Sequence, residues 1–213
     1  MAITDTGLAP APLLVERMER LCALAQEGTV LVQLRDVALD ARARLALGAE
    51  LREITRRSGQ LLAVNDRLDL ARLLDADAVH LGERSFATED ARRLVGGVAV
   101  VRACHDPDRV GVRDAEAVVL SPVCEPRKGA PALGIEGLRR AAAGLRRVAP
   151  TRRLYALGGV DETSAARCLE AGAHGVACLG AVLDGRHPRA LLRALDIDRP
   201  LSRGEHPRLE PQS

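Results

Sequence analysis

Amide, acidic and basic side chains follow several short apolar runs of this sequence, at the point where each run ends. The clearest examples are Gln33, Arg35, Asn65, Asp66 and His105. An arginine can bind a phosphate through two parallel hydrogen bonds, and an aspartate can hold Mg²⁺ together with phosphate oxygens. A histidine can give or take a proton near neutral pH. These residue types predict a site for an anionic small molecule.

Some of these residues also have purely structural interpretations. Asp66 directly precedes a predicted helix, where it is a candidate N-cap. Arg35 is a candidate partner of Asp36 in a surface ion pair. His80 lies within an apolar run, where a histidine is more often a hydrogen-bonded core residue than a catalyst. The sequence leaves both kinds of role open.

Glycines follow the last two apolar runs, at Gly158, Gly159 and Gly180. Without a Cβ, their backbone can approach a phosphate closely, and amides at the start of the next helix complete an anion site. Ordinary tight turns are the alternative. Lys128 lies in a Pro- and Gly-rich loop, and all the other basic residues are arginine. Its compact ammonium suits a phosphate or pyrophosphate, although a solvated loop charge explains it equally well.

Eight short apolar runs alternate with eight segments whose leucines and alanines recur every three or four residues. The predicted strands are Ala2–Thr4, Thr29–Leu34, Leu61–Val64, Ala78–Leu81, Val98–Val101, Ala117–Leu120, Leu154–Leu157 and Gly175–Leu179. The predicted helices are Leu13–Gln26, Ala41–Arg57, Arg67–Leu74, Thr88–Val95, Pro107–Arg113, Ile135–Val148, Glu162–Ala171 and Pro188–Leu195. Gly28, Gly59, Gly96 and Gly172 follow helices, where left-handed caps are expected.

Strands without polar faces, each followed by a helix, are typical of parallel sheets. Eight such repeats predict an α/β fold, a single (β/α)8 TIM barrel over residues 1–197. A doubly wound open sheet is the main alternative, but no GxGxxG motif follows the first strand. In a barrel the carboxyl ends of all strands meet at one mouth, which would gather the polar residues. Residues 198–213 contain few apolar side chains, so we expect a disordered tail.

Composition excludes several classes of protein. The chain has 213 residues, a formal charge of only +2, and one Phe and one Tyr as its aromatic residues. It therefore lacks the basic field and the stacking side chains of nucleic-acid binders. The five cysteines form no CxxC pair, so we expect a reducing cytoplasm. We also expect no targeting leader and no membrane insertion, because no apolar stretch approaches roughly 18 residues.

Longer motifs run through nearly the whole chain in a specific order. They include VQLRD at 32–36, LAVNDRLDLA at 62–71, DAVHLGE at 77–83, LSPV at 120–123, YALGGV at 155–160 and AGAHGVACLGAVL at 171–183. This ordered set resembles the thiamine phosphate synthase and TenI superfamily. The resemblance implies a (β/α)8 barrel that binds a phosphorylated thiazole. In the synthases it also implies an aminopyrimidine pyrophosphate, Mg²⁺, and joining of the two substrates with release of pyrophosphate.

The resemblance also assigns roles to individual residues. Gln33, Arg35 and Asn65 resemble the contacts of the pyrimidine pyrophosphate, and Asp66 resembles a Mg²⁺ ligand. The glycine turns, at 158–159 and around 180, resemble the cradle of the thiazole phosphate. Lys128 resembles a loop lysine that meets pyrophosphate. Arg35 and Lys128 would then stabilise the charge that develops on the leaving group.

Several positions depart from the synthase pattern. Val37 replaces a lysine, Ser85 replaces a second Mg²⁺ aspartate, and Ala103 replaces a serine. Glu83 is a candidate substitute for the missing carboxylate. Pro122 stands where the tautomerase branch has a histidine, so neither branch is matched fully.

We therefore carry a transferase hypothesis and two alternatives. The first is a thiamine phosphate synthase-like enzyme that acts on small phosphorylated substrates. The second is a TenI-like thiazole tautomerase with His105 or His80 as the base, and the third is a non-catalytic thiazole- or thiamine-phosphate-binding protein. A homo-oligomer remains open in each case.

Overall fold

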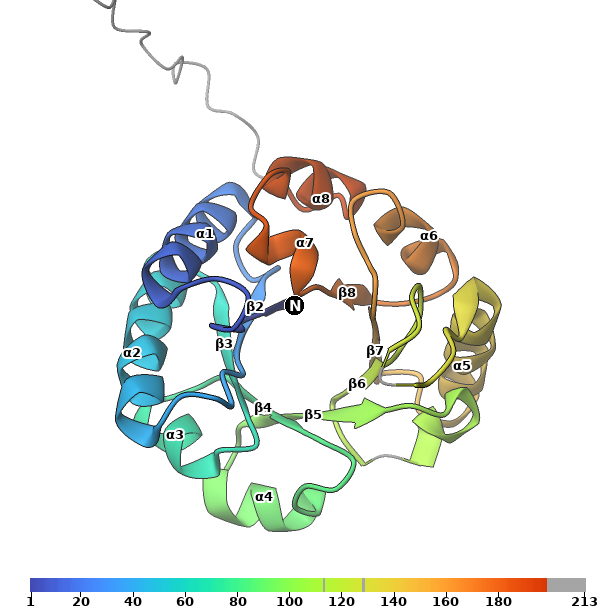
Figure 1. Ribbon diagram of the computed structural model, residues 1–213. Helices are drawn as coiled ribbons and strands as arrows, with labels where there is room; N and C mark the ends of the chain where they lie inside the picture. The colour runs from blue at the N-terminus through green and yellow to red at the C-terminus, as the bar shows by residue number, and fades with distance from the viewer. Residues whose placement is uncertain (113, 128, 199–213) are drawn as a thin grey trace, which may run out of the picture.

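The computed structural model describes residues 1–112, 114–127 and 129–198. It forms a ring of strands surrounded by helices (Figure 1). The strands are β1 (Ala2–Ile3), β2 (Leu31–Leu34), β3 (Leu61–Asn65), β4 (Ala78–Leu81), β5 (Ala99–Cys104), β6 (Ala117–Leu120), β7 (Arg153–Leu157) and β8 (Gly175–Ala177). They pair in parallel, in the order β1 to β8.

Backbone hydrogen bonds close the ring between its first strand and the residue after its last. The N–H of Ile3 donates to the carbonyl of Cys178, and the N–H of Cys178 donates to the carbonyl of Met1, both at 2.9 Å. Ala2 and Cys178 also form a parallel bridge. The predicted (β/α)8 barrel is therefore confirmed, and the open sheet is not.

Helical segments follow every strand and cover the outside of the ring (Figure 1). They are α1 (Ala11–Leu24), α2 (Ala41–Arg57), α3 (Leu68–Leu73), α4 (Thr88–Val95), η1 (Pro107–Val112), α5 (Gly134–Val148), α6 (Ala165–Glu170), α7 (Gly180–Leu183) and α8 (Pro188–Ala194). Two helical segments differ from the sequence prediction, and both follow strands whose ends carry predicted site residues. The fifth crossover is a short 3₁₀ helix, and α7 is an additional helix that begins at Gly180.

The barrel has two hydrophobic regions because successive strand residues point to opposite faces. Outward side chains such as Leu34, Leu62 and Leu120 are fully buried against the helices. Inward side chains such as Ile3 and Val101 form a smaller cluster inside the ring. This two-sided burial explains why the strands carry so few polar residues.

The predicted left-handed glycine caps are present in part. Gly28, Gly59, Gly96 and Gly172 all have positive φ, between 68° and 99°. Gly59 and Gly172 directly follow the C-cap residues of α2 and α6, and Gly96 is the C-cap of α4 but has a ψ of −135°, outside the left-handed helical region. Gly28 does not cap α1, because Ala25 occupies that C-cap. Asp198, which the sequence placed in the tail, instead pairs with Ala25 in an antiparallel bridge. Its carboxylate also lies 3.3 Å from the Arg193 guanidinium, so the folded part includes this residue. The rest of the predicted tail, residues 199–213, lies outside the described residues. Among the described helices, none combines the length and the apolar character needed to cross a membrane.

Two helical glycines offer a matched test of packing. A Cβ added to Gly144 in α5 meets nothing within 4 Å, whereas one added to Gly48 in α2 lies 2.5 Å from Cδ1 of Leu74 and 2.9 Å from Cδ2 of Leu34. We expect Gly144→Ala to raise the free energy of unfolding by about 0.5–1 kcal/mol through helix propensity. Gly48→Ala should lower it by about 1–3 kcal/mol because both leucines are buried. Urea denaturation measures both values, and equal effects would contradict this account.

Candidate active site

The carboxyl ends of the strands bring most of the predicted site residues to one mouth of the barrel. Asn65 is the last residue of β3, Arg35 follows β2, His105 follows β5, and Gly158 and Gly159 follow β7. Gly180 begins α7, which comes after β8. Lys128 lies outside the described residues, so its proposed place in this ring stays a prediction.

A continuous chain of side-chain hydrogen bonds crosses the strands at this mouth. Asn65 Nδ2 donates to Asp66 Oδ2 at 2.9 Å, and Gln33 Nε2 donates to Asn65 Oδ1 at 3.0 Å. Gln33 Nε2 also lies 2.7 Å from His80 Nδ1. An ionised carboxylate can only accept, so Asp66 sets the direction of each following bond. His80 Nδ1 must then be the acceptor, and the proton of the neutral ring sits on Nε2.

This chain leaves two buried polar atoms without a partner, namely Gln33 Oε1 and His80 Nε2. Gln33 is 0% exposed and His80 is 7% exposed. The pKa of His80 is lowered to about 4, mainly by burial; the charge of Asp66 opposes this shift, and those of Arg102 and Arg35 add to it. His80 is therefore neutral at pH 7. The site offers one unpaired acceptor and one unpaired N–H donor.

Arg35 pairs with Asp5, in the loop after β1, rather than with Asp36. Its Nη1 lies 2.9 Å from Oδ2 of Asp5, and both side chains are roughly one-third exposed. Asp36 is 2% exposed and accepts from the Thr4 hydroxyl and the Thr6 N–H. The proposed Arg35–Asp36 surface pair is thus wrong. The Asp5 contact holds one edge of the guanidinium at the mouth.

Asp66 does not cap the following helix, because Arg67 occupies the N-cap position of α3. Asp66 instead has a left-handed φ of 56°, and its Oδ1 accepts from the N–H of Gly82 at 3.2 Å. The carboxylate is exposed at the mouth. This fixed carboxylate suits Mg²⁺, which is usually bound by one or two carboxylates together with substrate phosphates. In the described part of the chain no three His, Cys, Asp or Glu side chains form a metal cluster.

His105 and Glu83 lie together on the next part of the rim. Oε1 of Glu83 is 3.4 Å from the N–H of His105. His105 Nδ1 is 2.8 Å from the carbonyl of Ser121, which can only accept, so Nδ1 carries the ring proton in this contact. Nε2 is then the basic nitrogen. The role of Glu83 as a second metal ligand stays a prediction.

Both glycines after β7 have positive φ, 105° at Gly158 and 67° at Gly159. A Cβ on Gly158 would lie 3.0 Å from Cα of Pro122, and one on Gly159 would overlap the side chain of Glu125. No side chain other than hydrogen fits here. Gly180 has no neighbour within 4 Å of an added Cβ, so its surroundings are open. The Glu125 contact puts a carboxylate beside the predicted phosphate cradle, which sequence reasoning did not foresee.

The positions that depart from the synthase pattern surround this mouth. Val37 is 64% exposed in the loop after β2. The N–H of Ser85 donates to the carbonyl of Gly82 in the loop after β4. Ala103 is half-buried in β5, one residue before its end. Val37 and Ala103 are apolar at these positions, and Ser85 is polar but uncharged, while the barrel itself is unaltered.

Comparison with known proteins identifies the family. The thiamine monophosphate synthase (TMP-TENI) family matches residues 1–182. The chain belongs to this family. The thiamine-phosphate synthase of Thermus thermophilus is 40% identical over 186 residues, which cover 85% of this chain and 86% of that protein. The enzyme of the same name from Thermobifida fusca is 37% identical over 179 residues, 81% of this chain and 80% of that one.

A solved structure supports the same assignment. A thiamine phosphate pyrophosphorylase from Pyrococcus furiosus superposes with a TM-score of 0.77 and 25% sequence identity. The match covers 92% of this chain and 94% of that one. The thiamine monophosphate synthase fold therefore extends over the whole described barrel.

The buried, neutral His80 should make the free energy of unfolding depend on pH. An unfolded histidine binds a proton near pH 6.5, whereas folded His80 stays neutral down to about 4. Between these values the unfolded chain binds more protons, so stability falls as the pH decreases. From pH 7 to pH 5, we expect wild type to lose about 2 kcal/mol more unfolding free energy than His80→Gln. Urea denaturation at each pH measures this difference. His187→Gln, at an exposed histidine, should keep the wild-type pH dependence.

Proposed function

We propose that this protein is a thiamine phosphate synthase. It joins an aminopyrimidine-methyl pyrophosphate to a thiazole phosphate and releases pyrophosphate. The C–O bond to the leaving group breaks first, which leaves a pyrimidine-methyl cation. The thiazole nitrogen then forms the new C–N bond with its lone pair.

The unpaired atoms of Gln33 and His80 carry this proposal. Along one edge, an aminopyrimidine presents an amino N–H beside a ring nitrogen that accepts. Gln33 Oε1 can accept from the amino group, and the Nε2–H of His80 can donate to the ring nitrogen. Leaving both atoms buried and unpaired costs free energy that this edge would recover. The Asp66-directed chain fixes the amide of Gln33 and the tautomer of His80 before substrate binds.

The pyrophosphate end of the substrate meets the charged part of the mouth. The Arg35 guanidinium keeps N–H donors beyond its contact with Asp5, and these can bind phosphate oxygens. Asp66 is the residue we propose to hold Mg²⁺, and the bound ion would neutralise negative charge on the pyrophosphate. Lys128 is proposed as a further cationic contact. Together these groups would favour departure of the anionic leaving group.

The thiazole phosphate is proposed to bind on the β7 and β8 side of the mouth. The backbone at Gly158, Gly159 and Gly180 can approach its oxygens, and β7 and β8 are neighbours in the ring. The nitrogen would then face the pyrimidine carbon from across the barrel. Holding the two reacting atoms in line is the main contribution of the protein to the rate.

The cellular setting is also a proposal. All five cysteines are free, and four of them are buried. This pattern suits a reducing compartment, so we place the protein in the cytoplasm. Its proposed partners are the two small phosphorylated substrates.

The decisive experiment supplies the purified protein with both substrates and Mg²⁺. We expect pyrophosphate and thiamine phosphate in equal amounts, measured by a coupled phosphate assay and chromatography. Asp66→Asn keeps the size but removes the charge, so the Mg²⁺ concentration for half-maximal rate should rise at least about tenfold. Asp69→Asn is the control, because Asp69 is exposed and pairs with Arg67.

Two other outcomes would overturn the proposal. Proton exchange on the thiazole substrate without pyrophosphate release would indicate a tautomerase, with His105 Nε2 the available base. Thermal stabilisation by thiazole phosphate that ignores Mg²⁺, without turnover, would indicate a binding protein. The relatives described above carry the name synthase, which favours the first reaction.

Glu125 provides a further test, because its carboxylate lies beside Gly159. A carboxylate near a bound phosphate repels it. We expect Glu125→Gln to lower the KM for thiazole phosphate about threefold, a modest effect because the residue is exposed. The KM for the pyrimidine substrate should change little. Glu50→Gln on the outer surface of α2 should alter neither value, and an increased KM in Glu125→Gln would contradict the repulsion.

A further inference from the structure

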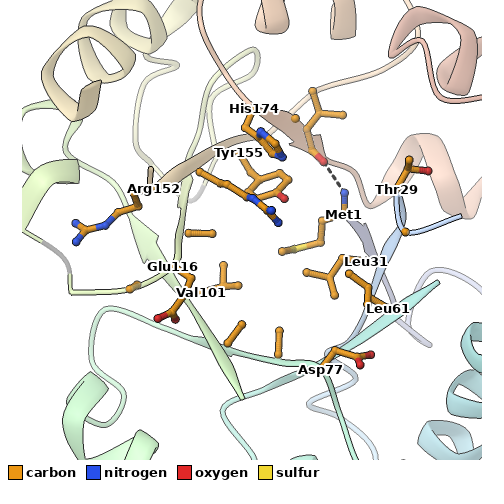
Figure 2. A pocket seen from close by; sticks show the side chains of 18 of the residues that line it. Met1, Thr29, Leu31, Leu61, Asp77, Val101, Glu116, Arg152, Tyr155 and His174 are labelled. Carbon is orange, nitrogen blue, oxygen red and sulfur yellow. Dashed lines mark hydrogen bonds between the residues drawn. The ribbon is translucent and has the colours of Figure 1, made fainter. Parts of the chain in front are cut away.

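A second cavity opens at the opposite end of the barrel, where the strands begin. Its volume is about 800 Å³, within the range of small-molecule pockets. Leu31 and Leu61 line one side, and Tyr155 and His174 line the other. Figure 2 shows these side chains around a common hollow. None of the residues assigned above to the reaction lines it.

The cavity exists because the first inward position of several strands carries a small residue. Ala78, Ala99, Ala117 and Gly175 occupy this layer in β4, β5, β6 and β8. Bulky branched side chains usually fill the corresponding layer of such barrels. A Cβ on Gly175 would lie 3.0 Å from Cε1 of Tyr155, so the glycine lets the ring lie against β8. The inward-facing part of the wall is consequently apolar and the centre is open.

The two acidic residues of the cavity are already neutralised. Asp77 Oδ2 is 2.7 Å from Nη1 of Arg52, and it also accepts from a backbone N–H. Glu116 Oε1 is 2.5 Å from Nη2 of Arg92, and Oε2 accepts from a second backbone N–H. Neither carboxylate therefore presents an unbalanced negative charge to a ligand.

The two arginines of the cavity are not balanced in this way. Within the described residues neither Arg152 nor Arg153 forms an ion pair; Arg152 donates to the carbonyl of Gly111 at 3.2 Å. Arg153 lies beside the hydroxyl of Tyr155 and is exposed. The Tyr155 ring also packs edge-on against His174, with centroids 5.6 Å apart. Arg153 thus places a cationic donor next to the aromatic ring, whereas Arg152 points away from it (Figure 2).

We propose that this cavity is a second binding site, which takes an organic anion with an apolar, ring-containing body. The body would lie among Leu31, Leu61 and Tyr155, and its acidic group would pair with Arg153. Charge complementarity selects an anion, because only the positive groups lack counter-charges. The apolar walls select against a bare phosphate or pyrophosphate. The site is separate from the mouth that binds the two substrates.

Anilinonaphthalene sulfonate is a suitable probe, since it combines aromatic rings with one sulfonate. We expect saturable binding to the folded protein, measured by fluorescence titration without substrates. Arg153→Ala should weaken binding about tenfold, because one charge-assisted contact is lost. Arg147→Ala, at an exposed arginine on α5, is the matched control and should bind as wild type. Neutral phenylnaphthylamine, which lacks the sulfonate, should also bind about tenfold more weakly.

A second variant tests the location directly. Ala99→Leu fills the cavity with a side chain, so it should weaken probe binding at least about tenfold. Thermal unfolding confirms that each variant is folded, and synthase turnover of Arg153→Ala should equal that of wild type. Probe affinity unchanged in both variants would overturn the proposal. Displacement of the probe by pyrophosphate with Mg²⁺ would also overturn it, because the probe would then occupy the mouth.

Discussion

Closure of the parallel ring is the constraint on which the rest of the structure depends. The bonds between Ile3, Cys178 and Met1 join the last strand to the first, so all eight strands point the same way around one axis. Every carboxyl end must then open at one mouth, and every amino end at the other. Residues separated by more than 140 positions, such as Arg35 and Gly180, therefore reach one rim without any long connection. The proposed substrate site and the proposed second site both follow from this geometry.

At the mouth, the exposed carboxylate of Asp66 determines which atoms donate and which accept along a chain of hydrogen bonds. Asp66 can only accept, and this fixes the amide of Asn65, then that of Gln33, and finally the tautomer of His80. Burial keeps the imidazole neutral, which preserves its Nε2–H as a donor. The ends of the chain of bonds thus serve different purposes. One end presents a carboxylate suited to a cation, and the other leaves an unpartnered acceptor on Gln33 and an unpartnered donor on His80, which we propose bind the aminopyrimidine edge.

Much of this arrangement could be predicted from the sequence, because the period of apolar residues reports burial on each strand and helix. The barrel and its polar rim followed from that period together with the glycine turns. Contacts between loops could not be predicted. The pairing of Arg35 with Asp5, instead of Asp36, depends on the register between β1 and β2. The approach of Glu125 to Gly159 depends on how the loop after β6 folds back. The pattern of apolar residues in the sequence also cannot show that an alanine of the barrel interior lines a cavity.

The same alternation along the strands gives the two ends of the barrel different chemistry. In β4, His80 and Ala78 are two positions apart and face the same interior. The upper position carries a hydrogen-bonding ring, and the lower one carries only a methyl group. Ala99 and Ala117 repeat the small inward residue at the lower end, where Leu31, Leu61 and Tyr155 surround the cavity. None of the residues proposed to bind the substrates lines this cavity, so a ligand there and a substrate at the mouth would not touch. Any influence of one on the other would have to pass through the strands themselves.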